Sequence, residues 1–108
     1  MIELTTSDGK KYKLGFTRNS IKQMEANGFN FSEYQNRPLT TTMELIEGAF
    51  RTYNPKMSEE KIYEIYSQME NKTEFLAALT QMVEEPLKIL MSPDSDEDKG
   101  KNVSWKVI

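Results

Sequence analysis

The chain has 108 residues, of which 37% are hydrophobic and 29% charged, and its formal net charge is −3. This length suits one domain with a single modest core. The acidic balance argues against a nucleic-acid binder, whose affinity depends on neutralising phosphates. The sequence contains no cysteine and no histidine, which excludes disulfides and thiolate zinc sites and removes the commonest general base. No apolar run is long enough to span a membrane, so we expect a cytoplasmic protein.

Residues 2–16 alternate apolar and polar side chains about a turn at residues 7–9, a pattern that predicts a β-hairpin. A two-residue turn would place Leu4 opposite Lys13, on the wrong face of the hairpin. A three-residue loop with a left-handed glycine instead pairs Leu4 with Tyr12. We therefore favour the three-residue loop.

A first helix is predicted to follow the hairpin, capped by Thr17 or Asn19 and running to about Asn27. Gly28 is well placed to end this helix in a left-handed conformation, with Phe29 folding back on it. The aromatic loop that follows is expected to cover one side of a helical bundle.

Two further helices are predicted after Pro38. The second helix is expected to follow Pro38, to start with a capping box at residues 41–44 and to end at residues 54–55. Ser58 is expected to cap the third helix, whose first turn is acidic as the helix dipole favours. Their predicted apolar faces consist of Met43, Ile46, Ala49, Phe50 and Tyr53, and of Ile62, Ile65, Tyr66 and Met69.

Residues 73–91 (TEFLAALTQMVEEPLKILM) carry a wide apolar stripe, and we interpret them as the central helix of the bundle. Pro86 removes a backbone donor, clashes with the carbonyl of Met82 and biases Glu85 away from helix. We expect either a kink there, or a stop near Glu84 and a new turn beginning at Pro86. The stripe consists of Phe75, Leu76, Leu79, Met82, Val83, Leu87 and Leu90.

The predicted fold class is therefore mainly α (α+β), with an N-terminal β-hairpin followed by a small bundle of about four helices. Residues 1–91 form this single domain, and residues 92–108 form an acidic flexible tail that ends in a strand-like segment, residues 103–108 (VSWKVI). A two-stranded hairpin is marginal in water. The segment could add a third strand to its own hairpin, pair with a neighbouring molecule, or remain unpaired.

Motifs for catalysis or metal binding are weak. Asp94, Asp96 and Asp98 alternate before Gly100 as in a calcium loop, but the glycine falls one place too late and Trp105 replaces the bidentate glutamate. We interpret these residues as a solvated acidic linker. The other carboxylates fall on polar helix faces or helix ends, and nothing forms a nucleophile–base pair. The sequence predicts no enzyme, no cofactor and no metal site.

The order of elements resembles that of a known family. A hairpin leads into FTRNSIKQMEANG, LTTTMELIEGAF, SEEKIYEIYSQM and FLAALTQMVEEPLKILM, followed by a polar tail. This layout, over roughly residues 1–91, resembles the small tail assembly chaperones of long-tailed bacteriophages and prophages, in particular those of phages of Gram-positive bacteria. The resemblance implies a non-enzymatic factor that holds the tape-measure protein and helps recruit tail tube subunits. It leaves open whether the protein forms a homo-oligomer.

Such a role needs an apolar, adaptable groove that accepts amphipathic helices and releases them again. The second to fourth helices could form this groove. An alternative is a small regulatory or adaptor protein of mobile-element origin that acts through protein–protein contact. The candidate partner-binding residues are Met43, Ile46, Phe50, Ile62, Tyr66, Met69, Met82 and Leu87.

Overall fold

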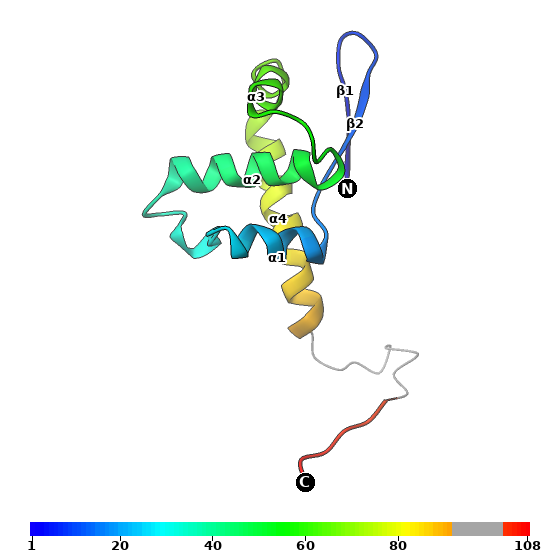
Figure 1. Cartoon of the computed structure of the whole chain (residues 1–108), viewed down its shortest axis with the longest axis vertical. Coiled ribbons are helices and arrows are strands. Elements are labelled where there is room, and N and C mark those ends of the chain that lie inside the picture. Colours follow the sequence, from blue (N-terminus) through cyan, green and yellow to red (C-terminus); the bar gives the residue numbers. More distant parts are fainter. Residues whose placement is uncertain (92–102) are drawn as a thin grey trace.

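The computed structural model describes residues 1–91 and 103–108. Within them the chain forms a two-stranded antiparallel hairpin followed by helices (Figure 1). This is the mainly α, hairpin-plus-bundle architecture that the sequence predicts. In chain order the elements are β1 (Ile2–Thr5), β2 (Lys11–Leu14), α1 (Arg18–Ala26), the short 3-10 helix η1 (Phe31–Glu33), α2 (Pro38–Tyr53), α3 (Glu59–Ser67) and α4 (Lys72–Met91).

The hairpin has the predicted three-residue loop and register. Leu4 lies opposite Tyr12, and the Thr6 N–H donates to the Lys10 carbonyl at 2.9 Å, which closes the loop. Gly9 has a φ of 86°, the left-handed conformation that such a loop requires at this position.

α1 begins and ends as the sequence predicts. The Thr17 hydroxyl accepts from the Ser20 N–H at 3.0 Å, and the Ser20 hydroxyl accepts from the Thr17 N–H at 2.9 Å. At the other end Gly28 has a φ of 101°, and the Phe29 N–H reaches back to the Met24 carbonyl at 2.9 Å. Because these reciprocal bonds satisfy the terminal backbone groups, local sequence alone fixes both ends of the helix.

The aromatic loop after α1 covers part of the bundle, as expected. Phe29 is buried, and the Phe31 ring lies 6.5 Å from it, between Phe29 and Tyr34. Because η1 contacts α2, this loop lies against α2.

α2 begins earlier than predicted. Pro38 is its first helical residue, a position where the missing N–H of proline breaks no helical hydrogen bond. Thr41 lies inside the helix, is almost fully buried and donates its N–H to the Arg37 carbonyl at 3.0 Å. The predicted capping box at residues 41–44 therefore does not start the helix.

α2, rather than α4, is the central helix, which corrects the sequence-based interpretation. Among the described elements, every substantial contact except that between β1 and β2 involves α2, which packs against β2, α1, η1, α3 and α4 (Figure 1). Gly48 allows α1 to approach closely, because a Cβ added there would lie 2.6 Å from the Met24 sulfur. The buried residues of α2 are Thr41, Leu45, Ile46, Ala49 and Phe50.

The hairpin is attached to the C-terminal half of α2 by polar contacts. The Gly15 N–H donates to the Ala49 carbonyl at 3.1 Å. The side-chain amide of Asn54 donates to the carbonyls of Lys13 and Phe50, each at 2.9 Å. These bonds satisfy both the end of α2 and the outer edge of β2.

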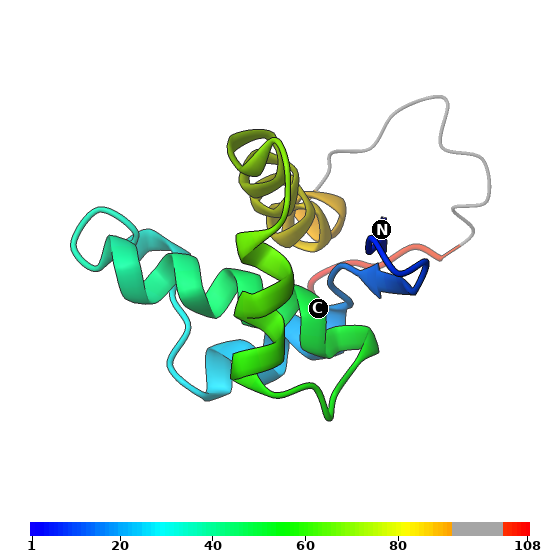
Figure 2. The ribbon, with the colours of Figure 1, turned by 90° about the horizontal axis from the view of Figure 1, so that it is seen from above.

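α4 crosses behind α2 instead of running alongside it (Figures 1 and 2). It continues without a stop through Pro86, so the predicted stop near Glu84 is wrong, whereas the alternative of a kink at Pro86 stays a prediction. The residues after the proline are mostly strong helix formers, and an ion pair of 3.7 Å between Lys88 and Glu84 spans the proline. These features hold the last turns in helical form despite the lost hydrogen bond.

Residues 103–108 form no strand, and neither β1 nor β2 pairs with them. The predicted third strand within one chain is therefore not present, and pairing with a neighbouring molecule stays a prediction. The linker, residues 92–102, lies outside the described residues, as do the aspartates that resemble a calcium loop.

The hydrophobic core joins the hairpin to all four α-helices, with α1 contributing only partly buried side chains. Leu79 and Phe50 are both fully buried within it. The buried apolar residues are Leu14, Phe29, Leu45, Ile46, Ala49, Phe50, Ile62, Ile65, Phe75, Leu79 and Val83.

Replacing either fully buried side chain by alanine should destabilise the fold strongly. We expect Phe50→Ala to lower the free energy of unfolding by about 3–5 kcal/mol and Leu79→Ala by about 2–5 kcal/mol, because each leaves a cavity. Leu39→Ala is the control: Leu39 is 73% exposed, and its loss should change stability by less than about 0.5 kcal/mol. Urea unfolding measures all three. A Phe50→Ala variant as stable as Leu39→Ala would refute the central position of α2.

Candidate functional site

The predicted partner-binding residues do not form one surface. Ile46, Phe50 and Ile62 are at most 3% exposed and belong to the core. A partner therefore cannot reach them in this conformation, which corrects their interpretation as an open groove. Their apolar character serves the packing of α2 against its neighbours.

Four other predicted residues are half-buried and lie in separate places. The Met43 carbonyl faces the Tyr63 hydroxyl at 3.4 Å, and the Tyr66 ring packs 6.1 Å from the Phe75 ring. Met69 lines a groove beside β1. Met82 lies against the backbone that enters α1, since a Cβ added at Gly15 would approach its methyl group to 2.9 Å.

Leu87 alone of the predicted set is exposed, at 63%. It belongs to a larger apolar surface that we call the α4 end, which consists of Leu87, Ile89, Leu90 and Met91, each 58–74% exposed. Ile89, Leu90 and Met91 were not among the predicted partner-binding residues.

The α4 end continues the buried stripe of α4 into solvent. Leu79 is fully buried and Val83 is 8% exposed, and Leu87 and Leu90 follow on the same side at spacings of four and three residues. A 20-residue helix is about 30 Å long. Because α4 crosses α2 (Figure 1), α2 covers only the middle of it, and α3 packs near its start. Among residues 1–91 and 103–108, no other helix or strand packs over its last two turns.

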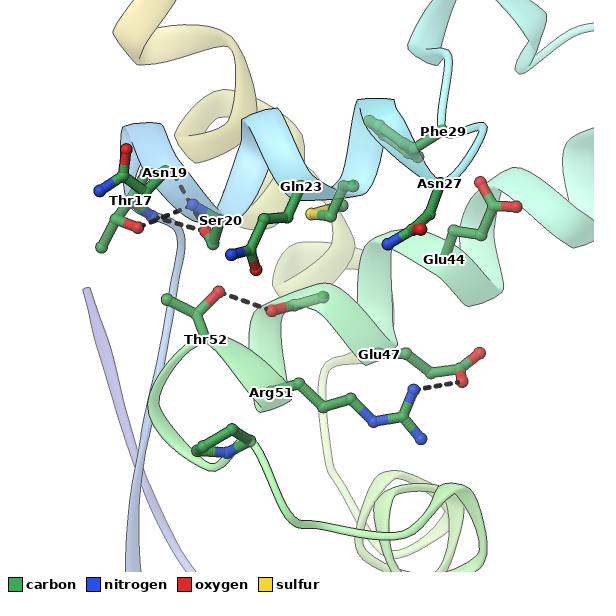
Figure 3. A pocket seen from close by; sticks show the side chains of 13 residues that line it. Thr17, Asn19, Ser20, Gln23, Asn27, Phe29, Glu44, Glu47, Arg51 and Thr52 are labelled. Carbon is green, nitrogen blue, oxygen red and sulfur yellow. Dashed lines mark hydrogen bonds and ion pairs between the residues drawn. The ribbon is translucent and has the colours of Figure 1, made fainter.

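A polar cleft of about 480 Å³ lies between α1 and α2 (Figure 3). Its floor includes Met24 and Gly48, where the two helices meet. The polar side chains that line it are Thr17, Asn19, Ser20, Gln23, Asn27, Glu44, Glu47, Arg51 and Thr52.

Two charged side chains of this cleft, Glu47 and Arg51, are engaged in structural contacts. The Arg51 guanidinium lies 3.2 Å from the Glu47 carboxylate and donates from Nε to the Met57 carbonyl at 3.2 Å. The other Glu47 oxygen accepts from the Tyr63 hydroxyl at 3.1 Å. This network ties α2 to α3 and to the connection between them.

The environment of Tyr63 changes its acidity. Burial, and then the hydrogen bond and negative charge of Glu47, raise the pKa of Tyr63 well above its ordinary value of 10.0. Burial also raises the pKa of Tyr66. Both shifts favour the neutral phenol, so these tyrosines act here as hydrogen-bonding and packing groups.

Within residues 1–91 and 103–108, no group of three or more acidic side chains is arranged to hold a metal ion. No helix in the same part of the chain has the length and apolarity that a membrane span requires.

In a comparison with protein families, residues 1–108 match a family described as "Domain of unknown function (DUF5055)". The chain belongs to this family. No curated protein and no solved structure matches the chain. The function of the DUF5055 chain therefore has to be inferred from its own surface features. These are the α4 end, the groove beside β1 and the cleft between α1 and α2.

The raised pKa of Tyr63 predicts a specific loss of stability in alkali. The folded chain holds the phenol proton more tightly than the unfolded chain, so this contribution is complete below about pH 10 and declines as pH rises above it. Tyr63→Phe should cost about 1 kcal/mol near neutral pH through the lost hydrogen bond to Glu47. Above pH 10 the stability of the variant should fall less steeply, so the two curves converge. The measurement is the free energy of unfolding of both proteins between pH 8 and pH 11. A constant difference between wild type and Tyr63→Phe over this range would contradict this account.

Proposed function

We propose that this protein is a tail assembly chaperone of a phage or prophage. In this proposal it acts without catalysis in the cytoplasm of the bacterial host, holds amphipathic helices of the tape-measure protein, and helps recruit tail tube subunits. The observation that supports it is the α4 end, where Leu87, Leu90 and Met91 are 63–74% exposed on a helix that no other described helix or strand covers there. An amphipathic helix laid beside it would complete the stripe, in the manner of helix-in-groove recognition.

The size of the α4 end suits a contact that must later be released. Covering the exposed part of Leu87, Leu90 and Met91 would contribute about 1–2 kcal/mol for each side chain. Association itself costs about 4–15 kcal/mol in lost freedom of motion. One copy would therefore bind weakly, and only copies joined to one another would hold one long tape-measure protein firmly. Incoming tube subunits could displace such contacts one by one.

Co-expression with the tape-measure protein of the same phage or prophage tests this proposal. The wild-type chain should raise the soluble fraction of that partner. The double variant Leu87→Glu/Leu90→Glu should lose this effect, because two carboxylates would be desolvated against the partner's apolar face. Leu39→Glu is the matched control, since Leu39 is an exposed leucine at the start of α2, and it should retain full activity.

Two results would count against the chaperone function. One is a partner that is equally insoluble with and without the protein. The other is equal activity of the double variant and the Leu39→Glu control, which would remove the α4 end from the mechanism. Gene order separates the adaptor alternative: a chaperone gene should lie between those for the tube and tape-measure proteins, whereas an adaptor gene should adjoin a promoter-proximal repressor gene.

A further inference from the structure

The outer edge of β1 is open. In an antiparallel pair, successive residues turn their backbone groups alternately toward the partner strand and away from it. Because the Thr6 N–H donates to Lys10, Leu4 also faces β2, and Glu3 and Thr5 face outward. Among the described residues, no hydrogen bond uses these outward backbone groups. By contrast, Asn54 and α2 occupy the outer edge of β2.

Residues 103–108 have the alternating pattern of a β-strand that could pair with this open edge. In residues 103–108, Val103, Trp105 and Val107 alternate with Ser104 and Lys106. The three apolar side chains are 84–87% exposed. A strand with one apolar and one polar face is stable only when the apolar face is covered.

A groove of about 350 Å³ lies beside the open edge, between β1 and the end of α3. Leu4, Ile65 and Met69 form its apolar part. A strand added to β1 would place the residue opposite Leu4 directly over this groove. A tryptophan fits there, because it buries a large apolar area and its ring contacts methionine sulfur favourably.

We propose that residues 103–108 of a second copy of this chain add to β1 as a third, antiparallel strand, with Trp105 in this groove. The register follows from the faces of the two strands. Trp105 lies opposite Leu4, and Lys106 then falls opposite Glu3, where opposite charges stabilise a cross-strand pair. The full pairing is Ile2 with Val107, Glu3 with Lys106, Leu4 with Trp105, and Thr5 with Ser104.

The occupant is a second copy because a single chain leaves both parts unpaired. Residues 103–108 pair with neither strand of their own hairpin, and in Figure 1 they lie beyond the C-terminal end of α4, away from the hairpin. Reciprocal exchange between two copies would fill both open edges with the same interface, as in most homodimers. It would also extend each two-stranded hairpin to three strands. This inference does not depend on the chaperone function.

Disulfide trapping between two different variants tests the register and the source of the strand. The chain has no cysteine of its own. Glu3→Cys and Lys106→Cys chains, mixed in a glutathione redox buffer, should form mixed disulfide dimers in excess over both homodimers, because directly paired residues lie within disulfide range. Lys13→Cys is the matched control: Lys13 pairs with Glu3 on the same face of the hairpin but lies one strand farther from the open edge. It should give no excess of mixed dimer.

Fluorescence of Trp105, the only tryptophan, gives a second measurement. Its emission should shift to shorter wavelength as protein concentration rises. Thr5→Pro should abolish the shift by removing an outward N–H, whereas Thr5→Ala should retain it. The proposal is overturned if mixed disulfides do not exceed the control. It is also overturned if the Glu3→Cys/Lys106→Cys double variant closes only within one chain, or if the emission does not depend on concentration.

Discussion

The structure depends on one helix that is apolar on more than one side. Leu45 and Ala49 form one row of α2, and Ile46 and Phe50 form the adjacent row. Together they give α2 a buried face wide enough to touch several neighbours at once. Gly48 adds a close approach for α1 on a further side. β2 and the other helices therefore pack directly against α2, and the hairpin is held to its C-terminal half by backbone and amide hydrogen bonds.

This arrangement explains why the two proposed binding surfaces lie at the periphery. α4 packs across α2 and extends past it, so the α4 end is exposed as a consequence of the crossing geometry (Figure 1). The hairpin meets α2 through β2, so its other strand, β1, keeps an open edge. The cleft between α1 and α2 differs from both, because its Glu47 accepts from Tyr63 of α3 and its Arg51 donates to the Met57 carbonyl.

Features governed by short-range rules could be predicted from the sequence. The loop with Gly9, the cap at Thr17 and the stop at Gly28 each depend on residues within a few positions. The start of α2 could not, because both Pro38 and the residues near Thr41 are acceptable helix starts. Apolar spacing also could not tell Phe50 from Leu87: both belong to apolar stripes, and only the crossing of α4 over α2 exposes one and buries the other.

The central claim is that α2 organises the fold while the α4 end lies outside the core. Amide hydrogen exchange tests this most directly, because it gives an opening free energy for each residue. The amides of Ala49 and Phe50 should exchange only through global unfolding, and those of Leu90 and Met91 should exchange with a much lower opening free energy. Equal protection of these two pairs would place the α4 end within the cooperative core and contradict the account.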